Sequence, residues 1–193
     1  MDEDASSEER TLESTYSRAS FLFAPPDPSF RPPEYIPDFQ EAQRLYAIFR
    51  TRVDPVTRVI HKPTFETDMR AYYLNPGTFG GSPSYDDSKK ARATASFEAL
   101  LLAVFCGALN SLSEDEFLNE LNANRSTSSD IRGSLLQSNN RQTKKTYMQI
   151  LSFALEQSLL KARVLEKSSL NSVTAYCLFL VCLEIFHFPL SRA

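Results

Sequence analysis

The sequence predicts an all-α fold, an irregular multi-helix bundle. Apolar residues recur at helical spacing, only 5 of 193 residues are glycine, and hydrophobic residues make up 42% of the chain. Apolar residues three and four positions apart share one helix face, and scarce glycine argues against a turn-rich β architecture. A folded part of roughly 150 residues would bury about 70% of its unfolded surface, which is enough for one core.

The first 37 residues differ in composition from the rest of the chain. Residues 1–20 are rich in Ser, Glu and Asp, so we expect an acidic disordered tail without a targeting signal. Residues 21–37 are rich in proline, which excludes a helix and favours an extended linker. The aromatic residues of this linker are expected to dock on the chain's own domain, with docking on a partner as the alternative; they are Phe21, Phe23, Phe30 and Tyr35. Residues 38–193 are predicted to form one helical domain.

The first helix is expected over 38–53. Asp38 follows a proline and precedes a glutamate by three residues, a pattern similar to a capping box. Apolar residues then recur every three or four positions. Asp54 and Pro55 are expected to end this helix.

The same two signals, apolar spacing and N-cap residues, predict further helices. Thr64 is expected to cap a helix that runs to Leu74. The strongest apolar repeat predicts a helix over 93–112, and Ser113 can cap a short helix after it. Residues 122–140 are polar and predict a flexible loop, and a second long helix is expected over 143–165.

The last apolar segment, 173–188, has two interpretations. Its composition approaches that of a membrane span, but a span needs about 20 apolar residues and polar residues interrupt this segment. A buried helix at the centre of the bundle is the interpretation that we favour, with a C-terminal membrane anchor as the alternative. A central helix needs neighbours on every side, so we expect an incomplete domain. The helices at 93–112 and 173–188 should pack together, and their unfilled faces should bind a partner.

Catalytic and metal-binding patterns are missing from the sequence. No HExxH, CxxC, GxSxG or GxxxxGK[ST] occurs, and the two histidines lie far apart. The three cysteines lie in apolar runs, where cysteine usually behaves as a small buried hydrophobe of an intracellular protein. Carboxylates at 114–116 are explained by helix capping. We therefore expect no enzyme activity, no catalytic residue, and no metal or cofactor site in this chain; an enzyme built from residues distant in sequence is the alternative.

Charge gives no indication of nucleic-acid binding. The net charge is −3, whereas nucleic-acid-binding modules usually have a basic face. The densest basic cluster, 141–145, is interpreted as a solvated helix start. His61 is expected to hydrogen-bond within the connection between two helices, with a role in a ligand pocket as the alternative.

Residues 53–65 read Val-Asp-Pro-Val-Thr-Arg-Val-Ile-His-Lys-Pro-Thr-Phe. They resemble the V-D-P…H-x-P-T-F pattern of the fungal-specific transcription factor domain, the helical middle homology region of Zn2Cys6 zinc-cluster regulators. Apolar helices at 97–116 and 154–182 are similar to helices of that family in order and spacing, so the resemblance covers roughly 33–183. The family-motif positions, for which we expect a structural role, are Asp54, Pro55, His61, Pro63, Thr64 and Phe65.

The resemblance implies a regulatory domain of a nuclear transcription factor, which acts through helical protein contacts or by sensing a ligand. In the family, zinc and DNA contact belong to a cysteine-rich head. The acidic tail contains no cysteine, so zinc and direct DNA binding are expected only if a separate head exists. The family's later Gly-Leu-His-Arg-like motif is also missing, which again implies an incomplete domain. Partners are expected to be other proteins or further copies of the chain, and no membrane. A generic helical adaptor without a transcriptional role is the alternative.

Overall fold

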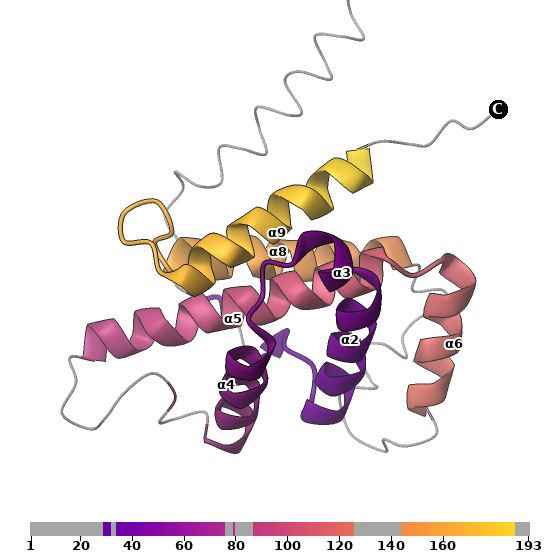
Figure 1. Ribbon diagram of the computed structural model, residues 1–193, viewed down its shortest axis with the longest axis horizontal. Coiled ribbons are helices and arrows are strands. Elements are labelled where there is room, and N and C mark those ends of the chain that lie inside the picture. The colour runs from indigo at the N-terminus through magenta and orange to yellow at the C-terminus, as the bar shows by residue number, and fades with distance from the viewer. Residues whose placement is uncertain (1–28, 32–33, 76–78, 80–86, 126–143, 188–193) are drawn as a thin grey trace, which may run out of the picture.

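The computed structural model describes residues 29–31, 34–75, 79, 87–125 and 144–187 (Figure 1). These residues form helices and no strand, which confirms the all-α prediction. The predicted acidic tail and the first part of the linker lie outside the described residues, as do Phe21 and Phe23. The helices are α2 (Phe39–Arg52), α3 (Asp54–Thr57), α4 (Lys62–Leu74), α5 (Asp87–Asn110), α6 (Glu114–Arg125), α8 (Lys144–Lys161) and α9 (Leu170–His187).

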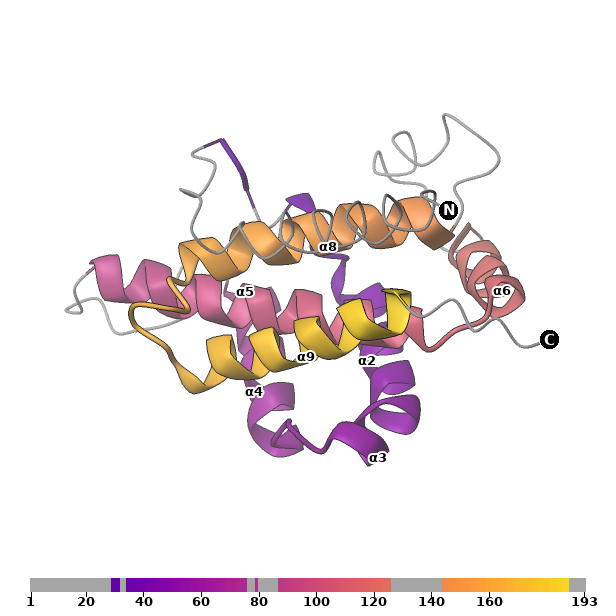
Figure 2. The same cartoon turned by 90° about the horizontal axis from the view of Figure 1, so that it is seen from above.

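Helix α5 is the centre of the molecule. It packs against α2, α8 and α9, and every residue from Ala95 to Leu109 is buried. Figure 2 shows α8, α5 and α9 running side by side, with α2, α3 and α4 on the opposite side from α8. The predicted packing of the two apolar helices is therefore confirmed, but the prediction that the C-terminal helix is central was wrong. Amino-acid composition alone cannot show which of two apolar helices is more deeply buried, because burial depends on how many other helices pack around each one.

Among the described residues, α5 is also the helix that is long and apolar enough to cross a membrane. A core helix of a globular domain passes the same test of length and composition. Its most apolar 18-residue window is 83% buried inside the molecule. Protein neighbours thus cover this helix on nearly all sides.

The predicted cap is present at the start of α2 and absent at the start of α4. The Asp38 carboxylate accepts the N–H of Glu41 at 2.9 Å, so the predicted cap of α2 is confirmed. In contrast, α4 begins at Lys62 with His61 as its N-cap, so the prediction that Thr64 caps this helix was wrong. Pro63 lies in the first turn of α4, where its missing N–H costs no hydrogen bond. The proline therefore allows the helix to begin earlier than Thr64.

Other predicted helix boundaries also shift. Helix α5 begins at Asp87, before the predicted 93, and α6 continues to Arg125, into the segment predicted as a loop over 122–140. The rest of that loop lies outside the described residues. Helix α8 begins at Lys144, close to the prediction, and ends at Lys161 rather than 165. Before α9, the Ser169 hydroxyl accepts the N–H of Ser172 at 3.2 Å and so caps the helix.

The last part of the proline-rich linker lies across α8 and α4. Phe30 is 4% exposed and its ring stacks on Tyr35 with centroids 5.1 Å apart. The Lys161 ammonium donates to the Phe30 carbonyl and lies 5.0 Å from the centre of the Phe30 ring. The Tyr73 hydroxyl donates to the Pro37 carbonyl at 2.8 Å. Docking of the linker on its own domain is therefore confirmed for Phe30 and Tyr35.

Candidate functional site

The family-motif positions lie in the corner between α2 and α4. Asp54 begins the single-turn helix α3 and is 4% exposed, and its Oδ2 lies 2.8 Å from Nζ of Lys62. The N–H of Arg58 donates to the Asp54 carbonyl at 2.9 Å and closes the turn. Arg58 has φ 48°, a left-handed conformation that reverses the chain direction toward α4. The corner thus depends on one buried carboxylate and one strained residue.

The exposed half of the motif begins α4. His61 Nδ1 lies 2.8 Å from the Thr64 hydroxyl, and both residues are exposed together with Pro55 and Pro63. The predicted hydrogen bond within the connection is confirmed, but the ring faces solvent. No third polar group joins this pair among the described residues. A histidine and a hydroxyl in this setting have the geometry of a local turn stabiliser rather than of a nucleophile and its base.

Phe65 connects the corner to the core. It is 3% exposed, and its ring lies 4.9 Å from that of Tyr46 on α2 and 5.9 Å from that of Phe97 on α5, measured between centroids. The structure therefore divides the motif into a buried pair, Asp54 and Phe65, and an exposed set at the two helix starts. Its geometry is that of a structural joint.

Lys62 is the ion-pair partner of Asp54, and the sequence pattern did not single it out. Its ammonium pairs with the Asp54 side chain through Oδ2, and Asp54 Oδ1 is buried without a hydrogen bond among the described residues. The two residues are eight positions apart, and no local helix spacing pairs them. Their contact requires the reversal at Arg58, which no sequence pattern at that position predicts.

Two tyrosine–glutamate pairs connect α4 to its neighbours. The Tyr46 hydroxyl donates to Glu66 Oε1 at 3.1 Å, and burial, followed by the nearby Glu66 charge, raises the pKa of Tyr46 to about 12. The Tyr72 hydroxyl donates to Glu98 Oε1 at 2.9 Å within the core. Burial raises the pKa of Glu98, while the hydrogen bond from Tyr72 and the charge of Lys161 oppose that rise. Both pairs join helices, and neither faces a nucleophile or a metal group among the described residues.

Polar contacts connect α6 to α2, and α8 to the chain just after α5. The Arg52 guanidinium bonds to both carboxylate oxygens of Glu116, at 2.7 and 3.0 Å. The Ser113 N–H donates to Glu116 at 2.8 Å and the Ser113 hydroxyl accepts the N–H of Glu116 at 3.2 Å, which confirms the capping interpretation of this carboxylate. Lys144 donates to the Leu112 carbonyl, so one member of the basic cluster 141–145 stabilises a helix end. The first three residues of that cluster lie outside the described residues.

The three cysteines differ in exposure. Cys106 and Cys182 are buried, and burial raises the pKa of both thiols, that of Cys182 to about 11. Cys177 is exposed on α9, so the prediction that all three cysteines are buried was wrong for this residue. Within the part of the chain that the structure describes, no three His, Cys, Asp or Glu side chains gather into a group that could hold a metal ion.

One face of α9 is exposed and apolar. The opposite face is buried against α5 and α8 through Ser172, Ala175, Leu178 and Cys182. The outer face has an apolar stripe at helical spacing, here called the α9 stripe. It consists of Leu170 (81% exposed), Val173 (42%), Cys177 (exposed), Leu180 (43%) and Val181 (42%). Such a concentration of exposed apolar side chains is typical of an interaction surface.

Comparison with known proteins gives one partial relative. The chain is 34% identical over 84 residues to the C6 finger domain transcription factor hasF of Aspergillus fumigatus. The match covers 41% of this chain and 11% of that protein, so the chain corresponds to a small part of its relative. No family model matches the chain, and no solved structure matches it. The relationship supports a transcription regulator at a coarse level.

Proposed function

We propose that the chain is a transcription factor-like regulatory protein of the nucleus that acts through contacts between helices and other proteins. The observation that carries this proposal is the partial identity to a C6 finger transcription factor. The all-α architecture supports it, because a helical regulatory domain is the fold that the resemblance implies. Direct DNA binding is left to a separate cysteine-rich head, and no enzyme activity is assigned to the chain.

The structure favours protein contacts over ligand sensing as the mode of action. The α9 stripe is exposed and apolar, which suits a protein partner. The family-motif positions form a joint between α2 and α4, with Asp54 paired to Lys62 and Phe65 in the core. In this proposal the motif preserves the shape of the domain and α9 provides the contact.

The proposal is tested by tethering the full chain to an unrelated DNA-binding domain upstream of a reporter gene. Reporter output is expected to change about tenfold in either direction, and a fluorescent fusion of the chain should collect in the nucleus. A matched control replaces Leu101, which is 0% exposed in α5, by Asp; this should unfold the domain while every surface side chain keeps its identity. An unchanged reporter with a folded, nuclear fusion contradicts the proposal.

The α9 stripe also supports a second candidate, a helical adaptor without a transcriptional role. An exposed apolar surface serves any protein partner, whether or not the partner regulates transcription. The two candidates differ in location and in the partners that co-purify. A fusion that remains outside the nucleus and binds no transcription protein favours the adaptor.

A further inference from the structure

We propose that the apolar segment 21–24 of this chain binds the outer face of α8, the side that carries Ile150 and Phe153. The segment reads Phe-Leu-Phe-Ala and precedes the part of the linker that the structure describes. In this arrangement the linker adds a further layer to the folded domain. The inference is independent of the proposed function, because it concerns a contact within one chain.

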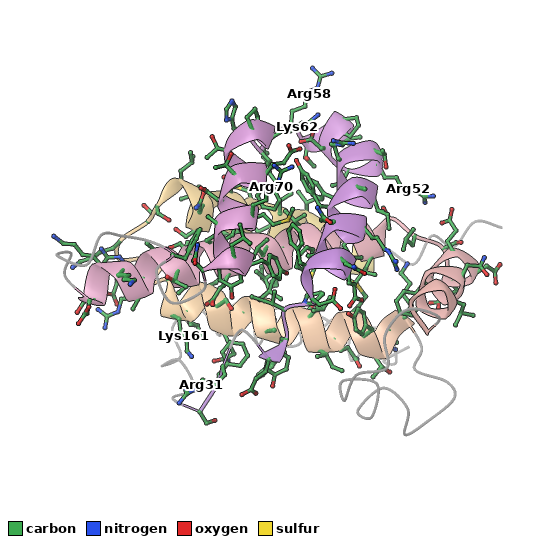
Figure 3. All side chains as sticks on the ribbon, turned by 90° about the horizontal axis from the view of Figure 1, so that it is seen from below. Arg31, Arg52, Arg58, Lys62, Arg70 and Lys161 are labelled. Carbon is green, nitrogen blue, oxygen red and sulfur yellow. The ribbon has the colours of Figure 1, made fainter. Side chains whose placement is uncertain are left out.

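The linker already occupies part of the outer face of α8. The Phe30 ring meets the Phe153 ring edge to face, with centroids 6.0 Å apart. Lys161, about two helical turns further along α8, donates to the Phe30 carbonyl, and its ammonium lies 5.0 Å from the centre of the Phe30 ring. In Figure 3, Lys161 and Arg31 lie on the side of α8 that faces away from α5. The chain that leads up to Phe30 therefore reaches the bundle at this face.

Apolar surface remains exposed beside Phe30. Phe153 is 45% exposed and Ile150 is 37% exposed. Side chains three positions apart lie on the same helix face, about 5 Å apart along the axis. Covering both side chains removes apolar area from water, and neither requires a charged partner. The face of α8 is thus incompletely covered at the place where the linker meets it.

The sequence before Phe30 fits this surface in composition and in length. Segment 21–24 contains two phenylalanines and a leucine, and Asp27 is the one charged residue between this segment and Phe30. Phe23 precedes Phe30 by seven residues, which span up to about 22 Å when extended. The apolar pair on α8 lies within that reach. Three prolines between the segment and Phe30 restrict the free linker, so docking loses less conformational entropy.

Continuity of the chain favours this segment over a separate protein as the occupant. Phe30 is 4% exposed and holds the end of the segment against α8. A short linker gives a tethered segment an effective concentration of about millimolar at its site. A separate protein or a second copy would lose translational and rotational freedom on binding, whereas the tethered segment has already lost most of it.

A fluorescence experiment tests the contact, because the chain contains no tryptophan. Phe23→Trp in the full chain should give short-wavelength emission that acrylamide quenches weakly, as for an indole packed against protein. Adding Ile150→Asp should shift the emission to the wavelength of the urea-unfolded chain. The matched control is Leu165→Asp, because Leu165 is an exposed leucine (54%) beyond the C-terminal end of α8, and it should leave the emission unchanged. Far-UV circular dichroism verifies that each variant is folded.

Dilution distinguishes the segment's own chain from a second copy. Short-wavelength emission that is independent of protein concentration supports docking within one chain, whereas a shift to long wavelength on dilution indicates a second copy and overturns the inference. If Phe23→Trp and Phe21→Trp both emit at the unfolded wavelength in folded protein, the segment is unbound and the inference is wrong. Short-wavelength emission that Ile150→Asp does not change overturns the location on α8.

Discussion

The side chain of Lys62 neutralises a carboxylate that the fold has removed from water. Asp54 is 4% exposed, and its contact with the Lys62 ammonium is 2.8 Å long. A buried charge without a partner costs several kcal/mol, while a pair replaced as a whole costs much less. At the scale of single residues, Asp54 and Lys62 therefore stabilise the family-motif corner together, as one ion pair.

Replacing Lys62 by Met should lower the free energy of unfolding by about 1–3 kcal/mol, because Asp54 then remains buried and unpaired. The double variant Lys62→Met with Asp54→Asn should regain most of this loss, since the buried charge is gone. Urea unfolding of the wild type, both single variants and the double variant measures the coupling. Losses that simply add up would mean that the two groups act independently.

Glu98 makes stability depend on pH. Burial raises its folded-state pKa above the unfolded value of about 4.3, so the folded state holds the proton more tightly. The contribution of Glu98 to stability is complete below the unfolded pKa and decreases as the pH rises through the folded pKa. Glu98→Gln should remove this decrease, so that the stability of the variant relative to the wild type increases as the pH rises above the unfolded pKa of about 4.3.

The control for this prediction is Tyr72→Phe. It removes the hydrogen bond that lowers the pKa of Glu98, so the decrease in stability with pH should become larger. Unfolding midpoints in urea across the pH range measure all three proteins. Identical pH profiles for the wild type and Glu98→Gln would show that Glu98 does not titrate differently in the folded state.

At the scale of the elements, α2 and α5 approach each other closely at Gly107. A Cβ atom on this residue would lie 3.3 Å from the ring of Phe49, which is itself 0% exposed. In an exposed helix, Gly→Ala stabilises by up to about 1 kcal/mol because alanine has the higher helix propensity. Here the buried ring must shift by a few tenths of an ångström to admit the methyl group, so Gly107→Ala should destabilise by about 1–2 kcal/mol.

Thermal unfolding measures this prediction. The double variant Gly107→Ala with Phe49→Leu is the control, because a smaller side chain at position 49 leaves room for the new methyl group. The Gly107→Ala substitution should therefore cost less stability in the Phe49→Leu background than in the wild type. A stabilised Gly107→Ala variant would mean that α2 shifts away from α5 at little cost.

Helix positions could be predicted from sequence more readily than helix ends. The apolar spacing in α2 and α5 and the cap at Asp38 predicted these elements correctly, because both signals are local. The first residue of α4 could not be predicted from these local signals. Its N-cap is His61 instead of the predicted Thr64, and Pro63 lies in its first turn. Similarly, the partner of Asp54 depends on the left-handed residue Arg58, a feature of the folded chain.

At the scale of the whole molecule, the sequence did not show how deeply each apolar helix is buried. Helices α5 and α9 are both rich in apolar residues, yet α5 contacts α2, α4, α8 and α9, whereas α9 packs against α5 and α8. The sequence predicted unfilled faces on these two helices but not which face of α9 is exposed. In Figure 3, α8 lies on one side of α5, and α2 and α4 lie on the other. A long apolar helix predicts that the helix is buried, but it does not predict which elements pack against it.

The central position of α5 has a consequence for synthesis of the chain. Helix α5 is complete at Asn110, but the helices that cover two of its sides, α8 and α9, are complete only at Lys161 and His187. At roughly 5–20 residues per second, a ribosome takes several seconds to produce that remainder. During this interval the nascent chain exposes one of its most apolar segments. A chaperone that protects apolar segments on the ribosome should therefore increase the yield of folded protein, and a stalled or shortened product should aggregate.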